Sequence, residues 1–193
     1  MIKNWKKKNE NGISISIDIY QPHLFYFDKV DKNTSSDFLK GTKFGIAWEY
    51  NGNEINIFDK NGTVEGFPTA NLEYVIAIFK NSILYPNPNN AVIFNLDGSF
   101  KKVIRIPNFK SEIILQEIKR GKKSNPPLDN DELYFSKYSR HIDKEGIEID
   151  ILDINYSLEY SESQILDSET LELTDFLKSR FDRNYYWNDN YKP

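Results

Sequence analysis

The clearest pattern in the chain is a strict alternation of apolar and polar residues over residues 13–20. A period of two over eight residues is typical of a β-strand with one buried face. The alternation predicts that every second side chain faces the core and that the serines and the aspartate between them do not. The residues expected to be buried are Ile13, Ile15, Ile17 and Ile19.

The same criteria predict further strands along most of the chain. Asn51-Gly52, Asn61-Gly62 and Asp97-Gly98 provide the positive φ angles that tight turns require. Residues 31–37 predict a loop, and residues 121–132, which are polar and contain Pro126-Pro127, predict a surface loop or short linker. The predicted strands cover residues 23–30, 43–50, 54–58, 73–79, 82–85, 91–96, 133–138 and 147–160.

Two segments have apolar spacings that favour helices. Between Ser111 and Gly121, a serine in the N-cap position and a glycine in the C-cap position favour a short helix, although the isoleucines there also suit a strand. From about Thr170 to Phe181, apolar residues lie within reach of one another on one helical face. The second segment therefore predicts a short C-terminal helix.

Residues 54–64 and 90–100 resemble each other at an offset of 36 residues, with an Asx-x-Asx-Gly turn in both. A strand, a turn and a strand repeated at this distance resemble two neighbouring blades of a β-propeller over residues 43–107. Two similar hairpins of a meander are the alternative. Together the patterns predict one mainly β domain over residues 1–193, an antiparallel meander, sandwich or propeller-like sheet with a short C-terminal helix.

The composition excludes cysteine chemistry and argues against secretion and membrane crossing. The chain has no cysteine, which excludes disulfides, thiol nucleophiles and thiolate metal sites and is typical of a reducing compartment. The basic N-terminal segment is not followed by the apolar region of a secretory signal, and the longest apolar runs are too short to cross a bilayer. We therefore expect a cytoplasmic protein without a membrane-bound segment.

No motif in the chain points to catalysis. His23 and His141 have neither a second histidine nor a cysteine at ligand spacing, and no phosphate loop, nucleophile elbow or dinucleotide fingerprint is present. The two Asx-rich turns lack the late glutamate of a calcium loop. We expect no metal, no cofactor and no enzymatic activity. An enzyme of unknown type that acts through Asp/Glu and Tyr side chains is an alternative.

Charge is distributed unevenly along the chain. Residues 143–175 contain eleven acidic residues against the single Lys144, whereas residues 101–123 contain eight basic residues against two glutamates. In the predicted strand 147–160, Glu148 and Asp150 alternate with isoleucines, so the acids are expected to form a row on the solvent face. Such a row would attract a basic protein and repel nucleic acid. A solvated sheet face that resists edge-to-edge aggregation is the alternative.

The acidic segment also contains tyrosines that could anchor a partner, and the cluster Tyr185-Tyr186-Trp187 is a further candidate anchor. The predicted protein-binding residues are Glu148, Asp150, Asp153, Tyr156, Glu159, Tyr160 and Glu162.

In its general character the chain resembles bacterial toxin-immunity proteins, because it is small, free of cysteine, acidic, rich in aromatic residues and without catalytic motifs. No single motif carries this resemblance. It implies a non-enzymatic module that neutralises a basic, nuclease-type toxin by occluding its active site. The alternative is a propeller-like or sandwich scaffold or ligand-binding module.

Overall fold

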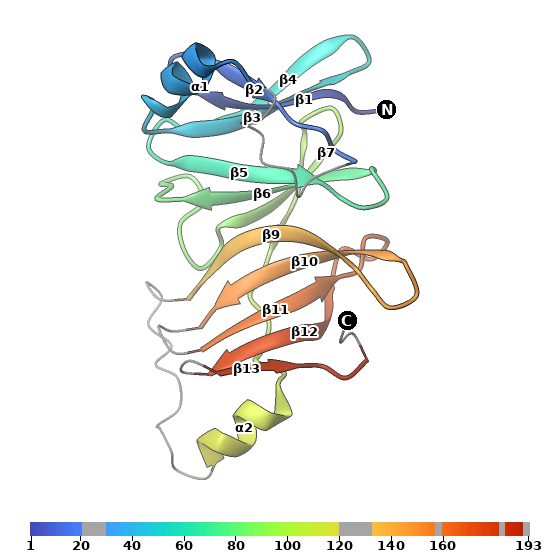
Figure 1. The fold of residues 1–193 in the computed structure, drawn as a ribbon. Helices are drawn as coiled ribbons and strands as arrows, with labels where there is room; N and C mark the ends of the chain where they lie inside the picture. The colour runs from blue at the N-terminus through green and yellow to red at the C-terminus, as the bar shows by residue number, and fades with distance from the viewer. Residues whose placement is uncertain (21–29, 120–132, 157–159, 182–183, 191–193) are drawn as a thin grey trace. The chain divides into compact units, whose positions relative to one another are not determined.

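The computed structural model describes residues 1–193 except 21–29, 120–132, 157–159, 182–183 and 191–193 (Figure 1). Its described residues form three antiparallel sheets and two short helices, so the prediction of a mainly β fold is confirmed. Neither helix has the length and apolar character needed to cross a membrane. The chain divides into two compact units, Met1–Pro86 with Ala91–Val103 and Asn87–Asn90 with Ile104–Pro193. The single domain expected over residues 1–193 stays a prediction.

The first unit contains two four-stranded sheets. Sheet A has the order β2-β1-β3-β4, and sheet B is the meander β5-β6-β7-β8. The strands of sheet A are β1 (Lys3–Asn9), β2 (Ser14–Ser16), β3 (Phe44–Tyr50) and β4 (Asn53–Ile57). Those of sheet B are β5 (Thr63–Pro68), β6 (Tyr74–Lys80), β7 (Ala91–Asn95) and β8 (Phe100–Ile104).

Aromatic side chains join the two sheets of this unit. Trp5 of β1 stacks on Trp48 of β3 with 5.3 Å between ring centroids, and it meets Phe67 of β5 edge-on at 5.7 Å. Trp48 donates its Nε1–H to the carbonyl of Leu96 at 2.7 Å, which satisfies a buried polar atom. The first unit is therefore a sandwich in which aromatic rings link the two sheets.

The alternating segment 13–20 forms a shorter strand than its pattern predicts, because β2 pairs with β1 only over Ser14–Ser16. Ile15 and Ile19 are buried, whereas Ile13 and Ile17 are half-buried. The serines and the aspartate between them are exposed, as expected. The predicted strand 23–30 falls almost wholly outside the described residues.

Residues 31–37 were predicted to form a loop, and this prediction is wrong, because helix α1 spans Lys32–Leu39. The Asp31 side chain caps the helix by accepting from the backbone N–H groups of Asn33 and Thr34 at 3.1 and 3.0 Å. Phe38 is buried against Phe44, with 5.1 Å between ring centroids. Packing of one aromatic ring thus stabilises a helix whose polar sequence suggests a loop.

The two copies of the 36-residue repeat differ in structure at their predicted turns. Asn51 and Gly52 both have positive φ and close the β3–β4 hairpin, and Gly98 has positive φ in the turn between β7 and β8. The segment containing Asn61-Gly62, however, leads from β4 in sheet A to β5 in sheet B. Since only the second copy is a hairpin, the repeat corresponds neither to two propeller blades nor to two similar hairpins.

The predicted strand 82–85 is irregular.

The second unit is built on the five-stranded meander of sheet C, in the order β13-β12-β11-β10-β9. The predicted single strand 147–160 forms β10 and the beginning of β11 (Figure 1). The strands are β9 (Tyr134–Ile142), β10 (Glu148–Asn155), β11 (Tyr160–Leu166), β12 (Leu173–Phe181) and β13 (Asn184–Trp187).

The predicted C-terminal helix at residues 170–181 is wrong, because these residues form β12 and pair with β11 and β13. Leu173, Leu177 and Phe181 are spaced by four residues, and four is a multiple of the strand period as well as about one helical turn. Buried Ser179 and Phe181 pair with Glu162 and Tyr160 of β11, which shows the period of a strand. Helix α2 (Glu112–Lys119) confirms the helical alternative for the segment after Ser111. The expected C-cap Gly121 and the predicted loop 121–132 lie outside the described residues.

We predict that Ile15→Ala lowers the free energy of unfolding by about 2–5 kcal/mol, because Ile15 is 3% exposed and its truncation leaves a cavity. Ser14→Ala, at an exposed neighbouring position, is the control and should change stability by less than about 0.5 kcal/mol. Urea denaturation measures both values. Equal effects of the two substitutions would show that the assigned face of β2 is wrong.

Candidate functional site

One face of sheet C is covered by the segment that leads into helix α2, residues 107–111; we call it the covered face. Tyr156 donates its hydroxyl to the carbonyl of Pro107 at 3.0 Å, and Gln164 donates to the carbonyl of Asn108 at 3.3 Å. The Phe109 ring meets the Tyr156 and Tyr160 rings edge-on at 5.1 and 6.2 Å. Four of the seven predicted binding residues are buried on this face, namely Asp150, Tyr156, Tyr160 and Glu162.

Glu162 holds the covering segment in place. Its carboxylate accepts from the backbone N–H of Lys110 at 2.9 and 3.0 Å and from that of Ser111 at 2.6 Å. Gln164 donates to the same carboxylate at 2.7 Å. Burial raises the pKa of Glu162, and these hydrogen bonds oppose the shift. Burial also raises the pKa of Tyr156, with the Glu162 charge as a smaller cause.

Asp150 is buried in a second polar cluster. Tyr138 donates its hydroxyl to Asp150 Oδ1 at 2.5 Å, and Arg140 Nε lies 4.0 Å from the same oxygen. Arg140 also contacts both carboxylate oxygens of Glu148 at 3.4 Å. Burial and the Asp150 charge raise the pKa of Tyr138 well above its usual value. The cluster compensates a carboxylate that is only 1% exposed.

The expected row of exposed acids along β10 is therefore wrong. The alternation is correct over residues 148–151, where acids and isoleucines occupy opposite faces of the strand, but both faces include buried positions. Further along the strand, Asp153 lies on the same face as Ile151. Asp150 is buried on one face and Ile151 on the other, whereas Ile147 at the start of the row is 55% exposed. Among the predicted residues, Glu148 is exposed, Asp153 is half-buried and Glu159 lies outside the described residues.

The meander gathers other acids of the segment at one end of sheet C. The β9–β10 and β11–β12 turns lie at the same end, because consecutive hairpins of a meander alternate between its two ends (Figure 1). Strand spacing places the two turns about 10 Å apart. Asp143 and Asp167 accept backbone hydrogen bonds within their turns, and the bonds from Thr170 and Glu169 lower the pKa of Asp167. We call the following residues the acidic end: Asp143, Glu145, Glu148, Asp167, Glu169 and Glu172.

The acidic end also exposes two large apolar side chains. Ile142 is 61% exposed and Ile147 55% exposed, and they flank the β9–β10 turn. Ile142 pairs directly with Glu148 across the two strands. Sequence reasoning missed Ile142 and assigned Ile147 to the inward face, because the alternation does not indicate where a sheet ends.

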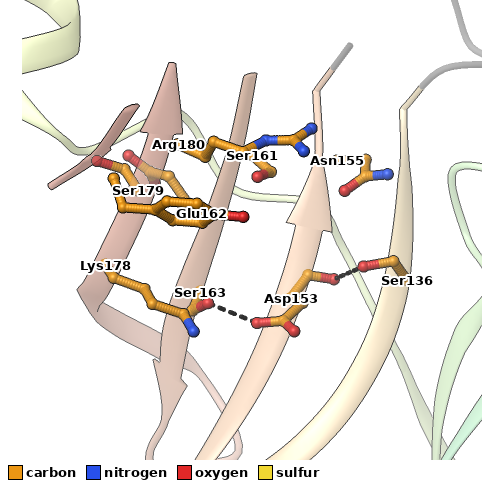
Figure 2. A pocket seen from close by; sticks show the side chains of 10 residues that line it. Ser136, Asp153, Asn155, Ser161, Glu162, Ser163, Lys178, Ser179 and Arg180 are labelled. Carbon is orange, nitrogen blue, oxygen red and sulfur yellow. Dashed lines mark hydrogen bonds between the residues drawn. The ribbon is translucent and has the colours of Figure 1, made fainter. Parts of the chain in front are cut away.

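The face opposite the covered face contains a hollow of about 260 Å³ over β11 (Figure 2). Asp153 accepts the Ser163 hydroxyl at 2.5 Å, and Ser136 donates to the Asp153 carbonyl at 3.2 Å. Sequence reasoning found Asp153 and, as a candidate anchor, Tyr185, but not the hollow itself. Its lining residues, all polar, are Ser136, Asp153, Asn155, Ser161, Ser163, Lys178, Arg180 and Tyr185, together with Glu162 and Ser179, whose side chains bond to Ser111 on the covered face.

No group of three or more His, Cys, Asp or Glu side chains in the described part of the chain is placed to hold a metal ion. His141 is half-buried in β9, with its ring centroid 6.3 Å from that of Trp187. His23 falls outside the described residues. Comparison with family models, curated proteins and solved structures found no match to this chain.

We predict that Glu162→Gln changes how stability depends on pH. Because the pKa of Glu162 is raised above its ordinary value of 4.5, the folded state holds this proton at pH values where the unfolded state has lost it. The wild-type protein therefore loses stability as the pH rises through the folded-state pKa of Glu162. The free energy of unfolding of the wild type, relative to Glu162→Gln, should therefore fall across this range. Denaturation at several pH values measures it, with exposed Glu169→Gln as the control. A difference that stays constant or grows with pH would contradict the raised pKa.

Proposed function

We propose that this chain is a non-enzymatic, cytoplasmic protein-binding module, an immunity protein that occludes the active site of a basic, nuclease-type bacterial toxin. The observation that supports the proposal is the acidic end of sheet C, where the carboxylates of two turns lie at the same end of the sheet as exposed Ile142 and Ile147. Exposed apolar side chains close to charged ones are typical of protein–protein contacts. A small-molecule site would need concavity rather than protruding turns.

The charges and the isoleucines would contribute to binding in different ways. Carboxylates gathered at one end of the sheet attract a basic surface together and accelerate its approach, an effect that salt screens. Burial of an isoleucine in a partner pocket would be worth about 1.5–3 kcal/mol and would mainly slow dissociation. We therefore expect the carboxylates of the acidic end to affect mainly the association rate and the isoleucines to affect mainly the dissociation rate.

The experiment first asks whether the gene immediately upstream encodes a basic, nuclease-type toxin, and uses that toxin as the candidate partner; a neighbourhood without such a gene would count against the proposal. Co-expression of the chain in a bacterial host should restore growth that the partner alone abolishes. Failure to protect, together with no binding at low salt, would contradict the proposal.

We predict that Glu145→Lys/Glu169→Lys slows association with that partner at low salt by about tenfold or more, and that the difference shrinks as salt rises. Both glutamates are exposed, so the variant should stay folded. Glu73→Lys/Asp37→Lys changes the net charge equally in the first unit and is the control. Ile142→Ser/Ile147→Ser should instead raise the dissociation rate. Equal behaviour of the two charge variants would exclude the acidic end as the contact.

A further inference from the structure

The hollow on sheet C follows from the register of three neighbouring strands. Ser163 lies between Asp153 of β10 and Lys178 of β12, and in the next row Ser161 lies between Asn155 and Arg180. Cross-strand partners project from the same face of a sheet. Because β11 contributes only serines to these two rows, the longer side chains of β10 and β12 form walls above it (Figure 2).

The β12 wall is cationic. Figure 2 shows Lys178 extending toward Ser163, and Arg180 crossing Ser161 toward Asn155. The Lys178 ammonium lies 5.6 Å from the centroid of the Trp187 ring, and none of the described carboxylates forms an ion pair with it. A half-buried ammonium without a carboxylate partner favours an anionic group beside it.

The β10 wall consists of hydrogen-bond acceptors. Asp153 accepts the Ser163 hydroxyl through Oδ1, and none of the described side chains donates to its Oδ2. Asn155 donates its amide N–H to the Tyr134 hydroxyl at 2.7 Å, which leaves its amide oxygen as an acceptor. This wall favours a cationic donor such as an ammonium group.

The two walls together select one class of ligand. A simple anion would be repelled by Asp153, a simple cation by Lys178 and Arg180, and an apolar molecule would leave the polar lining without hydrogen bonds. A volume of about 260 Å³ suits a small molecule. A molecule that carries an ammonium and a carboxylate on the same carbon satisfies both walls.

We propose that this hollow binds a small zwitterion, a free amino acid, with its carboxylate between Lys178 and Arg180 above the serines and its ammonium at Asp153. The hollow and the acidic end are separate groups of residues, so this inference does not depend on the proposed toxin partner. It would add a ligand-binding role to the second unit.

The test titrates the full chain with each of the twenty free amino acids and follows backbone amide shifts by NMR. At least one should bind saturably, with the largest shifts at Ser161 and Ser163. Its N-acetyl and methyl-ester derivatives should bind about tenfold more weakly or worse, because each loses one charged contact. Acetate and methylammonium, which carry one charge each, should not saturate the site.

Asp153→Asn and Lys178→Met should each weaken binding by about tenfold, whereas Lys144→Met, which removes an exposed lysine of the β9–β10 turn, should leave it unchanged. The amide spectrum of each variant confirms that it is folded. The proposal would be overturned if no amino acid bound, if acetate alone bound as tightly, or if Lys144→Met weakened binding as much as Lys178→Met.

Discussion

A carboxylate removed from water must receive hydrogen bonds, and the way Glu162 receives them determines much of the second unit. Its donors are the backbone N–H groups of Lys110 and Ser111, so the charge fixes the chain where it enters helix α2. Ser179 adds a hydrogen bond to the Ser111 side chain at 2.9 Å, and the Phe109 ring fills the space beside two tyrosines. One face of sheet C is thereby covered by residues 107–111.

This covering separates acids that shape the fold from acids that are available to a partner. Glu162 and Asp150 are each 1% exposed and compensated within the protein, so they stabilise one arrangement of the chain. Exposed carboxylates lie in and beside the hairpin turns that the meander places at one end of the sheet. The opposite face keeps a hollow where β11 contributes two serines, Ser161 and Ser163, between longer side chains of β10 and β12. The topology of the sheet, more than the composition of the chain, determines which carboxylates are exposed to a partner.

The sequence predicted the fold class because period-two alternation and Asx-Gly turns are local signals. It failed at residues 170–181, where a spacing of four suits both a strand and a helix, and at residues 31–37, where Asp31 and buried Phe38 stabilise a polar helix. Pairing with β11 and β13 decided the first case and packing of Phe38 on Phe44 the second, and a single sequence shows neither of these contacts.

The candidate site was predicted only in part for the same reason. The acidic segment, Glu148 and Asp153 were found from composition and alternation, whereas the burial of Asp150 and Glu162 depends on Arg140 and on the segment 107–111. The hollow depends on two serines lying between longer side chains of neighbouring strands. These arrangements bring together residues that are far apart along the chain, so local patterns do not predict them.

Native-state hydrogen exchange at the Lys110 and Ser111 amides tests the central claim most directly, because these are the groups that Glu162 binds. If Glu162 anchors the covering segment, both amides should exchange as slowly as those in the middle of β11. They should lose this protection in Glu162→Leu while β11 keeps its own. Exchange of both amides at the rates of an open loop in the wild-type protein would contradict the account, because the face with Asp150 and Glu162 would then not be closed.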